Sequence, residues 1–215
     1  MKRKMFLAFL MATVVAVMNV YADDDDEHRG YVSVAVEEIT AFENIISNAS
    51  FDVEFTQGNT TSVSIYGAPG QADNVALTVV GKTLYVGTKE NTSARNVKVI
   101  ITAPDLLCAI VNGSGDIDVK NLHNSKLTAT VIGSGDIELT GRCDEAEFTV
   151  NGSGDIDAED FPVEMLNVTV NGSGSVDCRC TDTLTAAVVG SGEIEYKGHP
   201  RNIYRSGRKA AIRHD

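Results

Sequence analysis

Carboxylate side chains recur at two fixed positions in the second half of the chain, and their spacing suggests metal chemistry. One position holds Asp116, Asp136, Asp155 and Glu193, interrupted by Ser175; the other holds Asp118, Glu138, Asp157, Asp177 and Glu195. If successive repeats stack, neighbouring carboxylates about 5 Å apart repel by roughly 1 kcal/mol in water and roughly 3 to 4 kcal/mol at an effective dielectric of 20. Ca²⁺ or Mg²⁺ bridging is therefore one hypothesis, with Asp116, Asp118, Asp136, Glu138, Asp155 and Asp157 as the ligands.

The competing interpretation, which we prefer, is a hydrated acidic surface. Ca²⁺ requires six to eight oxygens that converge on one point, and a straight row of carboxylates does not supply them. The Gly-Ser-Gly-Asp motif superficially resembles calcium-binding nonapeptide repeats, but those recur every nine residues. In the preferred interpretation, the first carboxylate of each repeat caps backbone N–H groups of the corner. We accordingly assign no metal and no cofactor.

Catalytic chemistry has little support in the residues. Closely spaced carboxylates suit general acid–base catalysis, as in β-helical polysaccharide lyases or hydrolases. In this chain they form a uniform repeat rather than one constellation beside Arg, Lys or His. The four histidines, His28, His123, His199 and His214, are scattered, and no Ser or Cys has an identifiable base. We expect a protein that is not an enzyme and assign no catalytic residue.

Four cysteines, Cys108, Cys143, Cys178 and Cys180, allow three disulfide pairings, and the sequence does not choose among them. A zinc site would need more clustering than Cys178 and Cys180 with His123 and His199 at irregular distances. Structural disulfides or buried thiols are the expected states.

The positions that carry the carboxylates belong to a sequence repeat. The repeats are Gly113-Ser-Gly-Asp-Ile-Asp-Val119, Gly133-Ser-Gly-Asp-Ile-Glu-Leu139, Gly152-Ser-Gly-Asp-Ile-Asp-Ala158, Gly172-Ser-Gly-Ser-Val-Asp-Cys178 and Gly190-Ser-Gly-Glu-Ile-Glu-Tyr196. Apolar residues stand two and six positions before each leading glycine and four after it, alternating with polar residues. Alternation with a period of two predicts strands with one buried and one solvated face. Each repeat therefore contains a strand, a Gly-Ser-Gly corner and another strand.

The repeat predicts an all-β fold, a single-stranded right-handed parallel β-helix with coils of about 20 residues. Equal residues then stack at about 4.8 Å, which makes the repeat a physical requirement. An antiparallel meander gains nothing from such stacking, leucine-rich repeats need a different frame and a return helix, and a transmembrane barrel needs an apolar outer band. Asn112, Asn151 and Asn171 precede the corner, and adjacent coils could stack Asn151 on Asn171 as an amide ladder. The corner glycines are expected to adopt positive φ.

The regular coils are expected over residues 107–198, and residues 31–106 are expected to form less regular β coils or a cap. Six strands are predicted there: Tyr31–Val36, Phe51–Phe55, Ser62–Tyr66, Ala76–Val80, Thr83–Val86 and Val97–Thr102. Residues 41–47 could form at most one helical turn. Residues 199–215 are a basic cap or tail: the last 19 residues carry a net charge of +5, against −20 for residues 23–196.

The first 22 residues have the pattern of a secretory signal peptide. Lys2, Arg3 and Lys4 precede an apolar run from Met5 to Met18, and Val20 and Ala22 suit a cleavage site. Residues 23–30 are expected to be an acidic, disordered linker. The mature chain would carry a net charge of −15 and contains no transmembrane helix candidate, and such acidity makes nucleic acid a poor partner. The predicted location is exported: periplasmic, outer-surface or secreted.

The order of motifs also resembles a known family. Phe42-Glu-Asn-Ile45, Phe51-Asp-Val53, Thr56-Gln-Gly58, Val97-Lys-Val99, Ile101-Thr-Ala-Pro104 and the Gly-Ser-Gly-Asp-Ile series are similar to the bacterial family named "putative autotransporter adhesin, head GIN domain", over about residues 31 to 200. The resemblance implies a β-helix on an exported protein and no established activity. We therefore expect a non-enzymatic binding scaffold for a protein or glycan ligand. The alternatives are a carbohydrate-active enzyme and a purely structural envelope protein.

Overall fold

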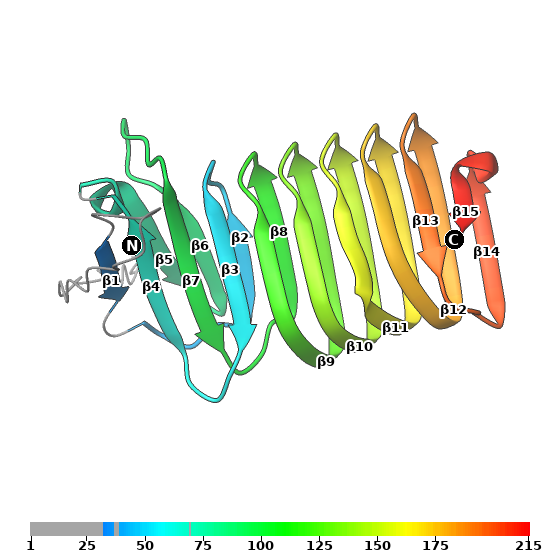
Figure 1. Ribbon diagram of the computed structural model, residues 1–215, viewed down its shortest axis with the longest axis horizontal. Helices are drawn as coiled ribbons and strands as arrows, with labels where there is room; N and C mark the ends of the chain where they lie inside the picture. The colour runs from blue at the N-terminus through cyan, green and yellow to red at the C-terminus, as the bar shows by residue number, and fades with distance from the viewer. Residues whose placement is uncertain (1–31, 37–38, 69) are drawn as a thin grey trace, which may run out of the picture.

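The computed structural model describes residues 32–36, 39–68 and 70–215, and it is an all-β solenoid (Figure 1). About 69% of the described residues are in strands and 3% in helical turns, and about five coils of roughly 20 residues stack through parallel pairing. The predicted parallel solenoid is confirmed. The proposed signal peptide (1–22), the acidic linker (23–30) and His28 lie outside the described residues. Among the described residues, no helix has the length and apolar character needed to cross a membrane.

The regular coils consist of six strands. They are β8 (Cys108–Gly113), β9 (Ile117–Gly133), β10 (Ile137–Gly152), β11 (Ile156–Gly172), β12 (Ser175–Gly190) and β13 (Glu193–Lys197). Register follows the sequence repeat, so that Val111, Val131, Val150, Val170 and Val188 stack in one buried row. Leu127, Ala146, Leu166 and Leu184 form another, but the first member predicted for that row, Leu107, is 40% exposed. Leu106 is buried instead, because the alternation of buried and exposed residues is shifted by one residue just before β8.

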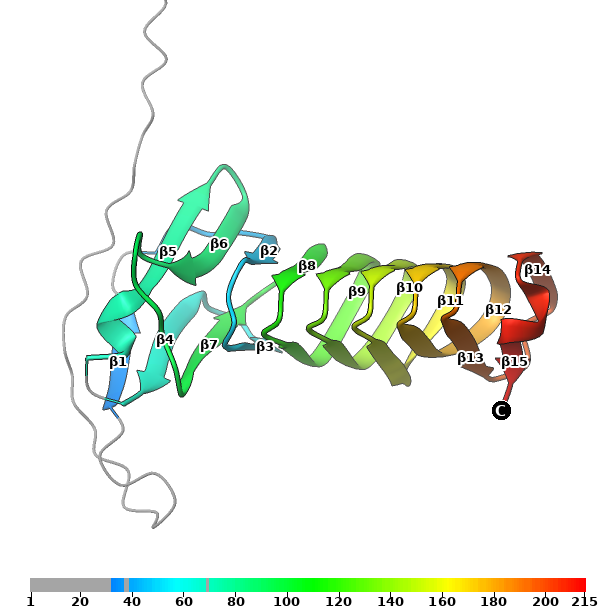
Figure 2. The same ribbon diagram turned by 90° about the horizontal axis from the view of Figure 1, so that it is seen from above.

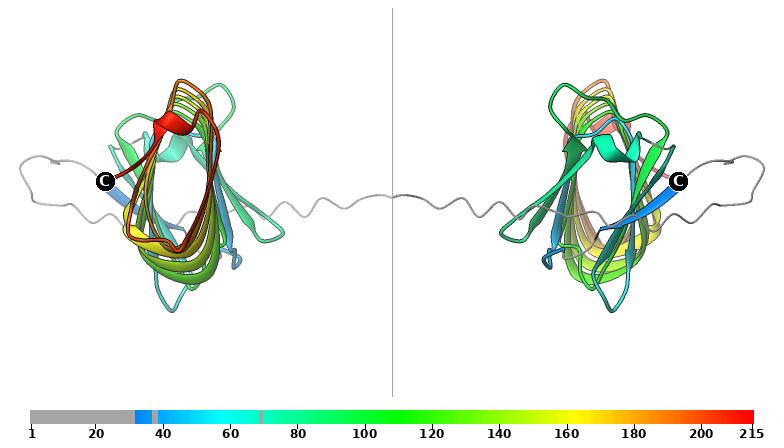
Figure 3. Two further views of the ribbon diagram at one scale, coloured as in Figure 1. Left: turned by 90° about the vertical axis from the view of Figure 1, so that its right-hand side faces the viewer. Right: turned by 90° about the vertical axis from the view of Figure 1, so that its left-hand side faces the viewer.

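Each long strand bends once between two straight runs, so the coils superimpose as a flattened oval when viewed along the solenoid axis (Figure 3). At the bend of β9, Asn121 has a φ of 55°, and β10 bends at Gly141. The other reversal of each coil is the Gly-Ser-Gly corner. The solenoid therefore has two broad faces.

The two glycines of each corner are required for different reasons. The leading glycines Gly133, Gly152, Gly172 and Gly190 have positive φ, as expected. The second glycines do not. A Cβ on Gly154 would lie 2.0 Å from the carbonyl oxygen of Gly135 in the preceding coil, so close stacking of backbones excludes any side chain there. The expectation of positive φ was thus wrong for the second glycines and for the leading glycine Gly113.

The N-terminal half contains seven strands, which include all six predicted ones. They are β1 (Val32–Val36), β2 (Asn44–Ser47), β3 (Asp52–Gln57), β4 (Ser62–Gly67), β5 (Val75–Val80), β6 (Thr83–Thr88) and β7 (Val97–Ala103), with a 3₁₀ turn η1 at Ala72–Asn74. The possible helical turn at 41–47 is wrong. Residues 44–47 form strand β2, because Ile45 completes the buried row between Leu84 and Ala109.

Chain order and spatial order differ in this half. The coil formed by β2 and β3 lies between the coil of β6 and β7 and the coil of β8 and β9. Antiparallel pairs end the solenoid: β1 on β4, β4 on β7, and β5 on β6. The β5–β6 hairpin diverges from β4 and β7 (Figure 2).

The basic C-terminal segment forms a last partial coil. It comprises β14 (Asn202–Gly207), the 3₁₀ turn η2 (Lys209–Ala211) and β15 (Ile212–His214). β14 pairs in parallel with β12, and β15 pairs with β13. Ala211 and Ile212 are buried, whereas every residue of β14 is exposed.

Candidate functional site

The first row of carboxylates supports the backbone of the corners. Oδ1 of Asp116 accepts a hydrogen bond from the Asp136 N–H at 2.8 Å, and Oδ1 of Asp136 accepts one from the Asp155 N–H at 2.7 Å. Oδ1 of Asp155 accepts from both the N–H (2.6 Å) and the hydroxyl (2.9 Å) of Ser175. Backbone capping is confirmed for Asp116, Asp136 and Asp155, each of which caps the following coil rather than its own, whereas Glu193 pairs with Arg213.

The second row is longer than the sequence indicated. Glu54, Asp118, Glu138, Asp157, Asp177 and Glu195 stack in register, followed by Arg213. Burial raises the pKa of the Asp118 carboxyl. Burial, and then the carboxylates of Glu195 and Glu159, raise the pKa of Asp177. Glu54 differs, because its hydrogen bond to Lys120 lowers its pKa, and the two groups are 2.8 Å apart.

These two rows give one side of the solenoid a strongly negative surface. We call it the acidic face: the outward side chains of 52–56, 98–102, 116–120, 136–140, 155–159, 175–179, 193–197 and 212–214. It carries twelve carboxylates against five cationic side chains, Lys98, Lys120, Arg179, Lys197 and Arg213. Lys197 pairs with Glu159 at 2.7 Å and with Asp215 at 3.3 Å, and Arg213 pairs with Glu193. Lys197 of β13 and Arg213 of the C-terminal segment thus pair with acidic residues at this end of the face.

The proposed cation ligands do not form a coordination sphere. Asp116, Asp136 and Asp155 each use Oδ1 for a backbone N–H, and Asp118, Glu138 and Asp157 follow a straight row. In the part of the chain that the structure describes, no three His, Cys, Asp or Glu side chains are grouped to hold a metal ion. The donor set does not fit a site that requires six or more converging oxygens. Cation bridging stays a prediction, which a calorimetric titration with Ca²⁺ tests.

The cysteines are free thiols rather than disulfides. Cys143, Cys178 and Cys180 face the buried interior, and Cys108 is half-buried. Burial raises the pKa of the Cys143 thiol to about 11 and also raises that of Cys178. Protonated, buried thiols are poor nucleophiles and poor metal ligands.

The three described histidines contact aromatic rings and backbone carbonyl oxygens rather than carboxylates. His199 stacks on His214 with ring centroids 5.6 Å apart, and His214 Nε2 lies 2.7 Å from the Gly198 carbonyl oxygen. His123 Nδ1 lies 2.9 Å from the Asn121 carbonyl oxygen. No ion pair links a carboxylate to any of these three rings in the described residues.

The opposite side of the solenoid is nearly uncharged, and we call it the neutral face. It consists of the outward side chains of 44–48, 83–87, 108–112, 126–132, 145–151, 165–171, 183–189 and 202–206. Thr130, Thr149 and Thr169 form one row in register. Asn171 donates to Asn151 at 3.0 Å, which confirms the predicted amide stacking, and Asn112 donates in the same way to Asn48. Only Lys126, Glu145 and Glu147 are charged among the outward side chains of these ranges.

Exposed apolar side chains concentrate on the neutral face. Of the eight large apolar residues exposed in the described chain, five lie there: Tyr85, Ile132, Met165, Val189 and Tyr204. Val80 lies in the adjoining β5–β6 hairpin, Leu107 precedes β8, and Ile203 lies in the terminal strand β14. None of the eight lies on the acidic face. Sequence reasoning missed this face, although uncharged residues occupy two outward positions in every repeat, the Thr row among them.

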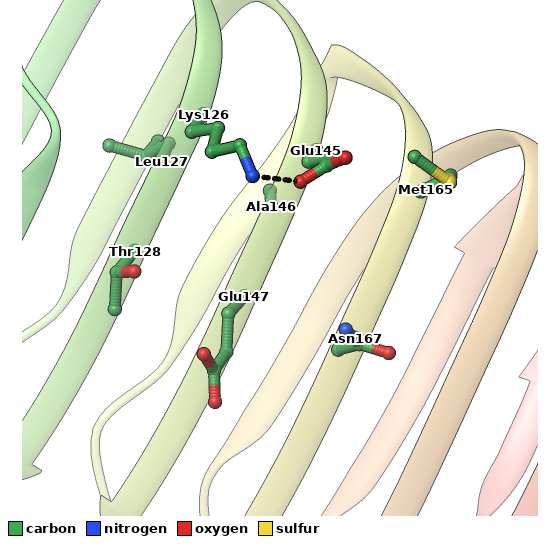
Figure 4. Close-up of a pocket in the computed structure, with 8 residues that line it drawn as sticks. All are labelled: Lys126, Leu127, Thr128, Glu145, Ala146, Glu147, Met165 and Asn167. Carbon is green, nitrogen blue, oxygen red and sulfur yellow. Dashed lines mark ion pairs between the residues drawn. The ribbon is translucent and has the colours of Figure 1, made fainter.

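A groove crosses β9, β10 and β11 on the neutral face (Figure 4). Its volume is about 360 Å³, and Lys126, Glu145, Glu147, Met165 and Asn167 are among its lining residues. Lys126 Nζ and Glu145 Oε2 pair at 2.7 Å across the gap between β9 and β10. The volume lies at the lower end of the range of ligand pockets, roughly 300 to 1,000 Å³.

Comparison with known proteins agrees with this architecture. The sequence model of the family described as "Putative auto-transporter adhesin, head GIN domain" matches residues 41–200, so the resemblance inferred from the motifs is confirmed. Among proteins of curated function, none matches this sequence.

Three crystal structures share the fold. A "putative adhesin" from Bacteroides fragilis is 24% identical, with a TM-score of 0.69 over 86% of this chain and 96% of the other. A "putative lipid binding protein" from Parabacteroides distasonis is 24% identical, with a TM-score of 0.53 over 86% and 97%. A "putative adhesin" from Parabacteroides merdae is 20% identical, with a TM-score of 0.51 over 86% and 96%.

Proposed function

The chain belongs to the family described as "Putative auto-transporter adhesin, head GIN domain", and from this premise we propose that it is an exported, non-enzymatic binding protein whose neutral face holds a protein or glycan ligand. The observation that carries the proposal is the segregation of exposed apolar side chains onto one regular, nearly uncharged face. Exposed apolar side chains that gather on one face mark interaction sites on soluble proteins.

The chemistry of the neutral face suits recognition by many weak contacts. Its Thr hydroxyls and Asn amides both donate and accept hydrogen bonds, so they can satisfy the polar groups of a bound surface. Tyr85, Met165 and Tyr204 belong to residue types enriched in interfaces. Rows about 4.8 Å apart repeat this pattern along the solenoid. The ligand that fits best is therefore extended and carries little charge.

The "putative lipid binding protein" among the neighbours suggests a different ligand class for that protein. In this chain, Phe55, Phe148 and Phe161 fill the interior of the solenoid and are fully buried. A lipid would have to contact the outside of the coils. The proposal therefore remains with a surface ligand, a protein or a glycan.

The test is retention of defined ligands by the immobilised full chain. Neutral polysaccharides (a β-glucan and a mannan), acidic ones (polygalacturonate and heparin) and two surface proteins (mucin and fibronectin) would be passed over it, and the eluate analysed by mass spectrometry. We expect retention of at least one ligand in intact form. Release of oligosaccharides would replace the proposal with the carbohydrate-active enzyme, and absence of retention would leave the structural envelope protein.

Two variants locate the binding surface. Thr169→Glu places a negative charge in the Thr row of the neutral face, and Ser173→Asp places the same charge four residues later on an exposed corner. We expect Thr169→Glu to weaken retention at least tenfold and Ser173→Asp to leave it unchanged. Equal effects of the two variants would remove the neutral face from the proposal.

A further inference from the structure

We propose that one partner of the neutral face is a second copy of this chain, packed face to face about a two-fold axis. This inference rests on the proposed function, since it names a partner for the surface assigned there. Homo-oligomers with two-fold symmetry use the same patch on both subunits, so a suitable patch must be self-complementary. Flatness, low charge and exposed apolar groups make the neutral face such a patch.

The distribution of charge favours this contact over one between two acidic faces. The neutral face has three outward charges, and Lys126 already pairs with Glu145. The acidic face has twelve carboxylates, and the whole chain carries a net charge of −12. Like charges brought together across an interface are costly, whereas packing through the neutral faces turns both acidic faces outward into water. Electrostatic repulsion therefore opposes a contact between two acidic faces and does not oppose one between two neutral faces.

The dimensions of the face match those of a small stable interface. Seven strands, β2, β8, β9, β10, β11, β12 and β14, lie side by side in this face. Six spacings of about 4.8 Å and six residue steps of about 3.3 Å give a plane of about 29 by 20 Å, or roughly 580 Å². Two such surfaces amount to roughly 1,200 Å², the lower limit for specific protein–protein interfaces. The exposed side chains of β6 would add to this area.

Three exposed apolar residues of the face lie at its two edges, with Met165 in the first outward row and Ile132 and Val189 next to the corner glycines. Met165, Ile132 and Val189 are 46%, 43% and 62% exposed, so their apolar atoms lie in water in the isolated chain. The groove across β9–β11 is a depression into which side chains of the second copy can pack. Stacked sheets approach to about 10 Å, a distance that such side chains fill.

The experiment is sedimentation velocity of the full chain between 1 and 100 μM. We expect the wild type to sediment as a species of twice its 22.9 kDa mass at the upper concentrations. Two variants each place a carboxylate in the face at outward positions: Thr149→Glu and Val189→Glu. We expect both to raise the dimer dissociation constant at least tenfold. Ser153→Asp adds the same charge at an exposed corner, four residues from Thr149, and should leave the constant unchanged.

A monomeric wild type at 100 μM overturns the inference, as does a dimer unaffected by both variants. Circular dichroism and thermal melting of each variant show whether it is folded, and a folded Val189→Glu alone is sufficient for the test. A monomeric wild type that still retains a ligand through Thr169 would reject the second copy and leave the proposed function intact. Loss of retention for every ligand would reject the proposed function, and a dimer broken by Val189→Glu would then stand as a separate result.

Discussion

Asp136 Oδ1 lies 2.7 Å from the backbone nitrogen of Asp155 and accepts its hydrogen bond across the gap between two coils. In the same way, Asp116 Oδ1 accepts a hydrogen bond from the Asp136 N–H, and Asp155 Oδ1 accepts one from the Ser175 N–H. The repeated carboxylate is thus explained by the stacking of corners. Three successive coils supply the acceptor that the following coil needs, whereas Ser175 interrupts the series and the Glu193 N–H bonds to the Gly174 carbonyl oxygen instead.

Removing one of these acceptors should weaken the solenoid. We expect Asp136→Ala to lower the free energy of unfolding by about 1 to 2 kcal/mol, because the Asp155 N–H loses a charge-assisted partner. Asp136→Asn keeps an acceptor oxygen and should cost less than half as much. Urea denaturation measures both, with Asp144→Ala at an exposed bend as the control. Equal stability of the Ala and Asn variants would contradict the capping role.

The second corner glycine should tolerate no side chain. Gly154→Ala would place a Cβ 2.0 Å from the Gly135 carbonyl oxygen. Because the obstacle is backbone, relief requires the coils to separate, and we expect a loss of about 2 to 4 kcal/mol. Gly87→Ala is the matched control, since no atom lies within 4 Å of the added Cβ. Chemical denaturation that finds the two variants equally stable would refute the stacking argument.

The acidic face predicts a specific pH dependence at Asp177. Burial and neighbouring carboxylates raise its pKa in the folded state above the unfolded value of about 3.9. In the interval between the two values the folded state binds more protons, so this group disfavours folding at neutral pH and ceases to do so as the pH falls through the raised pKa. Asp177→Asn should therefore melt at a higher temperature than wild type at pH 7.

The same comparison at lower pH supplies the control. The difference in melting temperature between Asp177→Asn and wild type should shrink as the pH falls toward 4, because the wild-type carboxyl becomes neutral. Glu54 has the opposite shift, since Lys120 lowers its pKa, so Glu54→Gln should destabilise the protein at pH 7. Identical signs for the two variants at pH 7 would be inconsistent with these assignments.

Much of the fold is readable from the repeat, and the exceptions have physical causes. Val111 and Val131 could be placed in one buried row from spacing alone, because equal phase means equal position in a solenoid. Strand β2 could not be placed in this way. Ile45 finds its neighbours, Leu84 and Ala109, 39 and 64 residues later in the chain, and nothing local to Asn44–Ser47 indicates that pairing.

The candidate surface was less predictable than the core. The acidic rows are visible in the sequence because Asp118 and Glu138 repeat as charges. The neutral face depends on the exposure of residues that differ from coil to coil, such as Met165 and Val189. From the sequence alone, an apolar residue at an outward position would be assigned to the core. Met165 and Val189 are recognised as outward only when their register with Glu145 and Asn171 is known.

The open C-terminal end suggests a last prediction, about association along the solenoid axis. Arg205 stands opposite Ala186, at a position that faces the buried interior in every earlier coil. Its guanidinium lies 5.5 Å from the centre of the Tyr196 ring and donates a hydrogen bond to the Tyr196 hydroxyl. A charged residue pointing inward at a free strand edge opposes the addition of another strand.

Replacing this cation should expose an adhesive edge. We expect Arg205→Leu to form species larger than the wild type in a concentration-dependent manner, because β14 would then present an apolar row that continues Ile203. Arg201→Leu removes the same charge from a position paired with Asp182 at the surface and serves as the control. Light scattering coupled to gel filtration distinguishes the two variants. If Arg205→Leu and Arg201→Leu have the same mass as wild type at 100 μM, Arg205 does not protect this edge, and its contact with Tyr196 contributes only to the stability of the last coil.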